Sequence, residues 1–160
     1  EEMHGAIRSA IAFNMKGIVS QKLLKSIRPG VARVPTVEVI DSRYENFKFD
    51  LISVVADNAS STRFITGGMM ANVEDVDLKN VGVVVEKNGE VVDVGAGAAV
   101  LGHPASSVAM LANLLAERGE HIPAGSFIMT GGITAAITVE AGDNISVRYQ
   151  GLGSVTCRFI

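Results

Sequence analysis

The sequence predicts a mainly β domain of the α+β class, with a curled or barrel-like sheet and one principal covering helix. Three observations predict this class: a hairpin signal in mid-chain, one long segment with helical spacing, and short β-like runs separated by glycine-containing turns. At 160 residues the chain suits a single domain, residues 1–160, that is long enough to bury a hydrophobic core.

The hairpin signal lies in "VGVVVEKNGEVVDVGAG", residues 81–97. Two runs rich in β-branched residues flank Asn88-Gly89, a pair that tolerates the positive φ angles of a type I′ turn. The stretch therefore predicts two antiparallel strands joined at Asn88-Gly89.

The helical segment follows in "GHPASSVAMLANLLAERGE", residues 102–120. Pro104 suits the first turn of a helix, and Gly119 supplies a stop. We therefore expect a helix over residues 104–118, with His103 capping or packing at its start. The predicted apolar face consists of Val108, Leu111, Ala112 and Leu115.

The remaining predicted elements are shorter. Ser20 precedes a Leu/Leu/Ile stripe, which predicts a helix over residues 20–27 that stops before Pro29-Gly30. Alternating or β-branched runs predict strands at residues 6–15, 36–40, 126–129, 137–140, 145–149 and 155–160.

Composition excludes several classes of function. The net charge of −3 gives no electrostatic footprint for nucleic acid. No apolar run approaches the roughly 20 residues of a membrane span. The single cysteine, Cys157, has no intramolecular disulfide partner and reads as a small buried hydrophobe. We expect a cytoplasmic protein that binds neither nucleic acid nor membrane.

Charged and polar residues gather in "VPTVEVIDSRYENFKFDLISVVADNASS", residues 34–61. A buried Glu38 requires a ligand or a partner such as Arg8 or Arg43. Asp41 and Arg43 could pair and shape the following loop. The polar residues that come after the apolar "LISVV" either form a turn and cap or border a site: Asp57, Asn58, Ser60 and Ser61.

Several longer motifs occur in a fixed order along the chain: "VEVIDSRYENFKFDL", "VADNASS", the stretch from "GAGAAVLGHPASS" to "SFIMTGG", and "YQGLGSV". They resemble the 2-keto-4-pentenoate hydratase / 4-oxalocrotonate decarboxylase family, and "DSRYENFKFDL" is more similar to the decarboxylase branch. The resemblance covers nearly the whole chain from Met3 onward. It implies a fumarylacetoacetate-hydrolase-like mixed sheet and lyase activity on linear unsaturated 2-oxo acids.

The resemblance also implies a Mg²⁺ or Mn²⁺ site built from three acidic side chains, because these cations prefer oxygen ligands. Glu38 matches the third ligand, on the strand leading into "DSR". The other two form a Glu-x-Glu before "IAF", where this sequence has Arg8 and Ala10. The formal charge of the three positions changes from −3 to −1 + 1 + 0 = 0, so we expect metal binding to be weak or absent.

For the substrate, the resemblance implies binding by Thr130, Gly131 and Ser61, with glycine allowing close approach of the backbone. The candidate catalytic residues are Arg8, Asp57 and Ser60. Met69 and Met70 are interpreted as core filler rather than as a binding surface.

The family's N-terminal region, including a catalytic lysine, is expected to be absent from this sequence. Two functions therefore stay open. The first is a carbon-carbon lyase for a small 2-oxo acid. The second is a non-catalytic truncated homologue that assembles with itself as a homo-oligomer or with a related hydratase.

Overall fold

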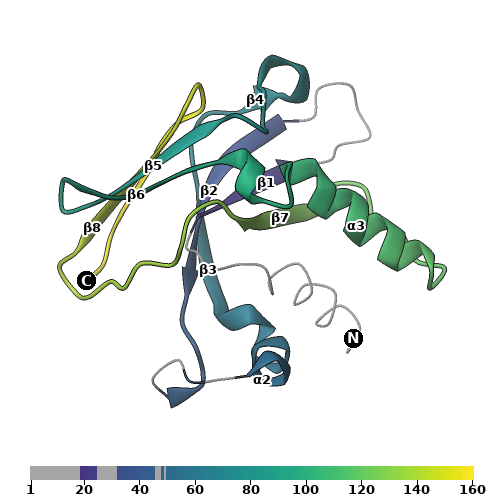
Figure 1. Cartoon of the computed structure of the whole chain (residues 1–160), viewed down its shortest axis with the longest axis horizontal. Helices are drawn as coiled ribbons and strands as arrows, with labels where there is room; N and C mark the ends of the chain where they lie inside the picture. Colours follow the sequence, from purple (N-terminus) through teal and green to yellow (C-terminus); the bar gives the residue numbers. More distant parts are fainter. Residues whose placement is uncertain (1–18, 25–31, 46–47, 49) are drawn as a thin grey trace.

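The computed structural model describes residues 19–24, 32–45, 48 and 50–160. Their strands form two sheets, one with the order β3-β2-β1-β7 and with β4 beside β2, the other with the order β6-β5-β8-β9 (Figure 1). The first sheet contains Val19–Leu24 (β1), Ala32–Ile40 (β2), Ser61–Thr66 (β3), Ala71–Asn72 (β4) and Phe127–Gly132 (β7). The second contains Gly82–Lys87 (β5), Glu90–Ala96 (β6), Asn144–Tyr149 (β8) and Gly153–Arg158 (β9).

Two α-helices and three short 3-10 turns connect these strands. The longer helix contacts β7, whereas the shorter one lies at the far end of the β2–β3 ribbon, away from the second sheet (Figure 1). The helices are Leu51–Ala56 (α2) and Pro104–Ala116 (α3), and the 3-10 turns are Asn58–Ser60 (η2), Val73–Asp75 (η3) and Gly97–Ala99 (η4).

The hydrophobic core lies between the two sheets. Alternate residues of β5 and β8 point into it, because successive side chains of a strand face opposite sides. Val37 joins this core from β2 in the first sheet. The buried cluster consists of Val37, Val81, Val83, Val85, Val100, Ile133, Ile145, Val147, Tyr149, Leu152 and Val155.

Strand β2 is buried on both of its faces, since every residue from position 34 to position 38 is buried. Val37 faces the core, so Thr36 and Glu38 point to the opposite side of the sheet. The buried hydroxyl of Tyr149 donates to the backbone carbonyl of Thr36 at 2.8 Å. This bond fixes the position of β2 along its length relative to the second sheet, at a point two residues from Glu38.

The first sheet is curled. The aromatic rings of Phe64 in β3 and Phe127 in β7 contact each other, with centroids 4.4 Å apart. Strands β2 and β1 separate these two strands in the sheet order, so a flat sheet would keep the two rings far apart. The contact therefore requires strong curvature, as the sequence predicted.

The predicted hairpin is confirmed. Strands β5 and β6 pair antiparallel up to Lys87 and Glu90. Asn88 and Gly89 between them have φ angles of 54° and 89°, as a type I′ turn requires.

The predicted principal helix is also confirmed, as α3. The side chain of His103 caps it by accepting a hydrogen bond from the amide of Ala105 at 3.0 Å, and Gly119 ends it with a φ of 71°. The expected apolar face is partly wrong. Ala112 is exposed and Val108 and Leu111 are half-buried, while the buried residues are Pro104, Ser107 and Leu115.

Three other expectations are corrected. Residues 19–24 form β1 rather than the start of a helix, because their backbone pairs with both β2 and β7. Residues 137–140 form no strand, although Ile137 and Val139 pack on the core; the Thr138 carbonyl accepts from Lys87 instead. All strand pairings in the described part of the chain are antiparallel, in two sheets rather than one mixed sheet. The expected strand at residues 6–15 lies outside the described residues.

The sulfur-containing residues are also more exposed than expected. Met69 and Met70 are 51% and 68% exposed, so they are not core filler. Cys157 is half-buried and packs on the edge of the core, where burial raises the pKa of its thiol.

Among the described residues, Gly97–Ala116 has the length and hydropathy of a membrane-spanning helix. The segment is not continuous, however. Leu101 and Gly102 have φ angles of 49° and 76°, and α3 begins only at Pro104. Its 13 residues span about 20 Å, less than the roughly 30 Å hydrocarbon core of a bilayer.

Gly97 in η4 packs closely against Leu78 in the turn before β5, and this contact can be tested by mutation. A Cβ atom at Gly97 would overlap the carbonyl oxygen of Leu78, whereas a Cβ at Gly68 would meet nothing within 4 Å. We expect Gly97→Ala to lower the free energy of unfolding by about 3 kcal/mol. Gly68→Ala should change it by less than about 0.5 kcal/mol. Urea unfolding of both variants is the measurement, and equal midpoints for the two would contradict this packing.

Candidate functional site

Glu38 is the most unusual buried side chain of the described residues. It is 2% exposed, and its Oε2 atom has no hydrogen-bond partner among them. Burial raises the pKa of Glu38 above its usual range, and a hydrogen bond donated by the Ser61 hydroxyl opposes this only in part. A buried carboxylate with a free oxygen is costly to keep, which marks the position as a candidate site.

Of the two partners that the sequence offered for Glu38, Arg43 is engaged elsewhere. Its guanidinium forms an ion pair with Asp57. The other, Arg8, lies outside the described residues, as does Ala10. The expected pairing of Arg43 with the Asp41 side chain is also not seen: Arg43 Nη1 donates to the backbone carbonyl of Asp41 at 3.2 Å.

Asp57 is buried and accepts hydrogen bonds on both carboxylate oxygens. Oδ1 receives Arg43 Nε, while Oδ2 receives the hydroxyls of Ser60 at 2.8 Å and Ser42 at 3.2 Å. Burial alone would raise the pKa of Asp57, but the bonds from Ser60, Arg43 and Ser42 outweigh it and lower the pKa. The carboxylate is thus held ionised inside a closed network.

The turn after Asp57 has an unusual backbone. Asn58, Ala59 and Ser60 have φ angles of 52°, 59° and 57°, so three consecutive non-glycine residues lie in the left-handed region. Each such residue costs about 1–2 kcal/mol relative to the right-handed conformation. The turn leads directly into β3, where Ser61 is the first residue.

Thr130 and Gly131 lie in β7 and are both buried. Gly131 has a φ of 129°, a conformation that favours glycine. The next residue, Gly132, pairs with Ser20, and Ser20 pairs with Thr36 two positions before Glu38. Two strand spacings separate this segment from β2, or about 10 Å. The register therefore places Thr130 and Gly131 level with the part of β2 between Val34 and Thr36, just before Glu38 along the strand.

These residues do not complete a metal centre by themselves. Within the described ranges no group of three Asp, Glu, His or Cys side chains is arranged to hold an ion. Glu38 fits the role of one ligand for Mg²⁺ or Mn²⁺, because it is a carboxylate with an unpartnered oxygen. One carboxylate is not sufficient for tight binding, so further ligands would have to come from outside the described residues.

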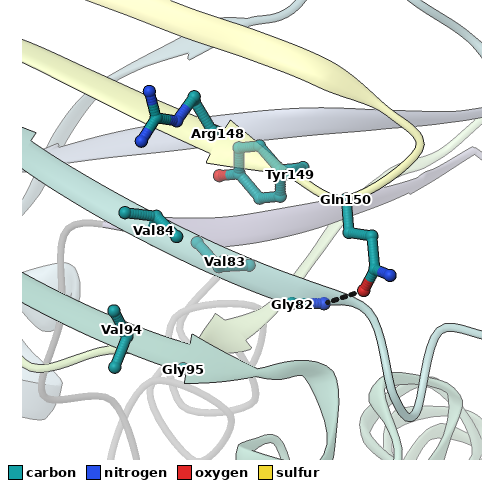
Figure 2. A pocket seen from close by; sticks show the side chains of 8 residues that line it. All are labelled: Gly82, Val83, Val84, Val94, Gly95, Arg148, Tyr149 and Gln150. Carbon is teal, nitrogen blue, oxygen red and sulfur yellow. Dashed lines mark hydrogen bonds between the residues drawn. The ribbon is translucent and has the colours of Figure 1, made fainter.

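A separate shallow hollow lies on the second sheet, lined by residues 82–84, 94–95 and 148–150 (Figure 2). Its volume is about 430 Å³. Polar groups at its rim are already paired: Gln150 accepts from the Gly82 amide at 3.2 Å, and Arg148 contacts Glu86 at 2.6 Å. None of the residues predicted to act on a substrate lines it, so it is not the candidate site.

Residues 42–160 match the family model described as fumarylacetoacetate hydrolase, C-terminal. The chain therefore belongs to the fumarylacetoacetate hydrolase family. It is 84% identical over 127 residues to a 4-oxalocrotonate decarboxylase of Pseudomonas putida, covering 79% of this chain and 48% of that protein. It is 86% identical over 127 residues to the enzyme of the same name from Pseudomonas sp. strain CF600, covering 79% of this chain and again 48% of the relative.

A solved structure of 4-oxalocrotonate decarboxylase from Pseudomonas putida G7, complexed with magnesium and adipate, is also similar. It matches with a TM-score of 0.83 and 68% identity, covering 89% of this chain and 59% of that one. The chain spans about half the length of the curated relatives that it matches. The expected resemblance to the decarboxylase branch is thereby confirmed, and so is the fold class.

The buried carboxylate leads to a pH-dependent prediction. Because the pKa of Glu38 is raised in the folded state, its contribution to stability is present at low pH and is lost as the pH rises through the folded pKa. Glu38→Gln removes this titration. In metal-free buffer at pH 8 we expect the variant to be more stable than the parent by about 1–3 kcal/mol, the cost of an unpartnered buried group.

The advantage of Glu38→Gln should shrink or reverse at pH 5. Thermal melts of both proteins at the two pH values, with a chelator present, are the measurement. A variant that is less stable than the parent at pH 8 would show that the Glu38 carboxylate has a stabilising partner.

Proposed function

We propose that this chain acts in the cytoplasm as the C-terminal part of a lyase for linear unsaturated 2-oxo acids, of the 4-oxalocrotonate decarboxylase kind. The observation that carries the proposal is the 84–86% identity over 127 residues to two enzymes of that name. The adipate in the similar solved structure supports the substrate class, because adipate is a linear six-carbon dicarboxylate.

Thr130, Gly131 and Ser61 are the proposed substrate-binding residues. Thr130 and Ser61 carry hydroxyls that can donate to a carboxylate, and the Ser61 hydroxyl would turn from Glu38 to the ligand when one binds. The φ of 129° at Gly131 lets the backbone approach a ligand without a side chain in the way. These groups lie on β7 and β3, at either side of Glu38 in the curled sheet. A dicarboxylate bound there would be held by neutral donors.

Decarboxylation of a 2-oxo diacid also needs an electron sink at the oxo group, which a bound Mg²⁺ or Mn²⁺ would supply. The described residues offer only Glu38 toward such an ion, so the described part of the chain binds and orients substrate without completing the reaction centre. The remaining groups would come from outside it. Arg8, at a position where the family has a ligand, is a candidate to pair with a substrate carboxylate.

A second function, that of a non-catalytic homologue which assembles with itself or with a related hydratase, is favoured by one observation. Two of the three positions that the family resemblance assigns to metal ligands hold Arg8 and Ala10. Such a protein would keep the fold, including Glu38 near the end of β2, but would not convert a substrate.

Binding and turnover separate these possibilities. We expect the purified chain to bind adipate, and Thr130→Val and Ser61→Ala each to weaken the affinity about tenfold, the usual effect of losing a hydrogen bond to a charged group. Thr156→Val, an exposed threonine of β9 on the second sheet, is the matched control and should have no effect. Calorimetric titration gives the affinities.

The same preparation is then tested for release of CO₂ from a 2-oxohexenedioate with added Mg²⁺ or Mn²⁺. Binding with turnover supports the lyase. Binding without turnover supports the non-catalytic homologue, and a failure to bind adipate at millimolar concentration overturns the proposed substrate site.

A further prediction concerns the metal. The natural chain should bind Mg²⁺ weakly or not at all, whereas Arg8→Glu combined with Ala10→Glu restores the family's Glu-x-Glu, with both side chains on one face if the segment forms the expected strand. We expect the double variant to bind Mg²⁺ or Mn²⁺ at least about tenfold more tightly, in line with the loss seen when supporting ligands are removed.

Two controls make this result specific. Adding Glu38→Gln to the double variant should abolish the gain, because all three carboxylates are needed. Micromolar binding by the natural chain, or a correctly folded double variant without any gain in calorimetric affinity, would show that the metal position is misplaced.

A further inference from the structure

The Arg43 guanidinium ties together three segments of the chain. Its Nε and Nη2 atoms donate to the carboxylate and the backbone carbonyl of Asp57, at the end of α2. Its Nη1 atom donates to the carbonyl of Asp41, just after β2, and lies 3.5 Å from the carbonyl of Ser61, at the start of β3. All three nitrogens therefore donate to groups within the protein.

The Asp57 carboxylate is saturated in the same way. Besides the bonds already described, its Oδ2 atom accepts from the backbone amide of Arg43 at 3.2 Å. A carboxylate that receives four hydrogen bonds and is 6% exposed is poorly suited to accept a proton from a substrate. Asp57 is thus better suited to hold its neighbours than to act as a general base.

Asp57 and Arg43 stabilise the left-handed turn at Asn58–Ser60. L-residues visit this conformation as single residues, and a run of three at Asn58, Ala59 and Ser60 persists only where the surroundings impose it. The Ser60 hydroxyl is bound to Asp57, its amide donates to the Asp57 carbonyl at 2.9 Å, and its carbonyl accepts from the Asp41 amide at 2.8 Å. The turn is thereby fastened on both sides.

The turn sets the direction of Ser61. A right-handed or extended path from Asp57 would enter β3 differently, and the register of β3 on β2 already shifts between Val39 and Ile40 to accommodate the entry. With the observed path, Ser61 pairs with Ile40, two residues beyond Glu38 and on the same face of β2, so that its hydroxyl reaches the Glu38 carboxylate. The Oε2 atom of Glu38 is then the oxygen that remains unpartnered.

We propose that Arg43 and Asp57 are positioning residues of the candidate site, which hold the left-handed turn at Asn58–Ser60 so that the Ser61 hydroxyl lies beside Glu38, where it can bind a 2-oxo diacid. The proposal rests on the proposed function. It assigns to Asp57 and Ser60 a supporting role in place of the catalytic role predicted from the sequence. The residues that touch the ligand would be Ser61 and those of β7.

The test compares Asp57→Asn, Ser61→Ala and their double variant in the full chain, with adipate as the probe. We expect each single variant to weaken adipate binding about tenfold. The adipate affinity of the double variant should equal that of the single variant with the lower affinity, because Asp57 acts through Ser61. If Asp57→Asn instead weakened binding by a general disturbance of the structure, its loss of affinity would add to the loss caused by Ser61→Ala.

Asp77→Asn is the matched control. Asp77 also accepts hydrogen bonds in a turn, from the Lys79 amide and from the amide and side chain of Asn80, but it is exposed and its partners lie within that turn. Its replacement should leave adipate affinity within about twofold of the parent, a change small compared with the loss of one hydrogen bond to a charged group.

A rescue variant tests the role of backbone strain. Ala59→Gly removes the penalty for a positive φ, so in the Asp57→Asn background it should restore at least part of the lost affinity. Crystal structures of the parent and of Asp57→Asn provide a readout that does not depend on ligand. We expect the Ser61 hydroxyl to leave Glu38 only in the variant.

The outcomes separate the two hypotheses. Adipate binding that is weakened by Ser61→Ala but unchanged by Asp57→Asn, or additive losses in the double variant, would overturn the positioning role and leave the proposed function intact. If the parent does not bind adipate, the proposed function fails, and the crystal structures decide the positioning role. A Ser61 hydroxyl that stays on Glu38 in Asp57→Asn overturns it.

Discussion

The burial of β2 on both faces is the constraint on which the rest of the structure depends. One face carries Val37 into the core between the sheets, and the other carries Thr36 and Glu38 into the curl of the first sheet. Because side chains alternate along a strand, a slip of one residue would move Glu38 into the core and Val37 out of it. The bond from Tyr149 to the Thr36 carbonyl opposes such a slip at the very position where the site begins.

The candidate site is kept at a cost to stability. A carboxylate oxygen without a partner among the described residues and three consecutive left-handed residues are both unfavourable. Glu38 carries the first, and the left-handed turn leads directly into Ser61, which hydrogen-bonds to Glu38. The ion pair of Arg43 with buried Asp57 offsets part of this cost, although Arg43 is half exposed and its charge is screened by solvent. Unfavourable groups that are held in place by their surroundings are typical of functional positions.

The described residues provide only part of a candidate metal and substrate site. Members of the family with high identity are about twice as long, and the described residues provide one carboxylate and several neutral donors rather than a complete set of ligands. Under the proposed function, the binding of substrate and the completion of the reaction centre would be separable properties of this chain.

The sequence by itself determined the fold class, the Asn88-Gly89 turn, the start of α3 at Pro104 and the family, because these depend on local backbone preference and on long motifs in order. It failed at residues 19–24, whose pairing with two distant strands overrides a local helical pattern, and at Met69 and Met70, whose exposure depends on what lies over them. Only the tertiary structure decided that Arg43 binds Asp57 rather than Glu38, since the two positions are 14 residues apart and meet only when the chain folds back through α2. The oxygen of Glu38 that has no partner within the described ranges is likewise a property of the folded chain, because it depends on which donors from other strands reach that point.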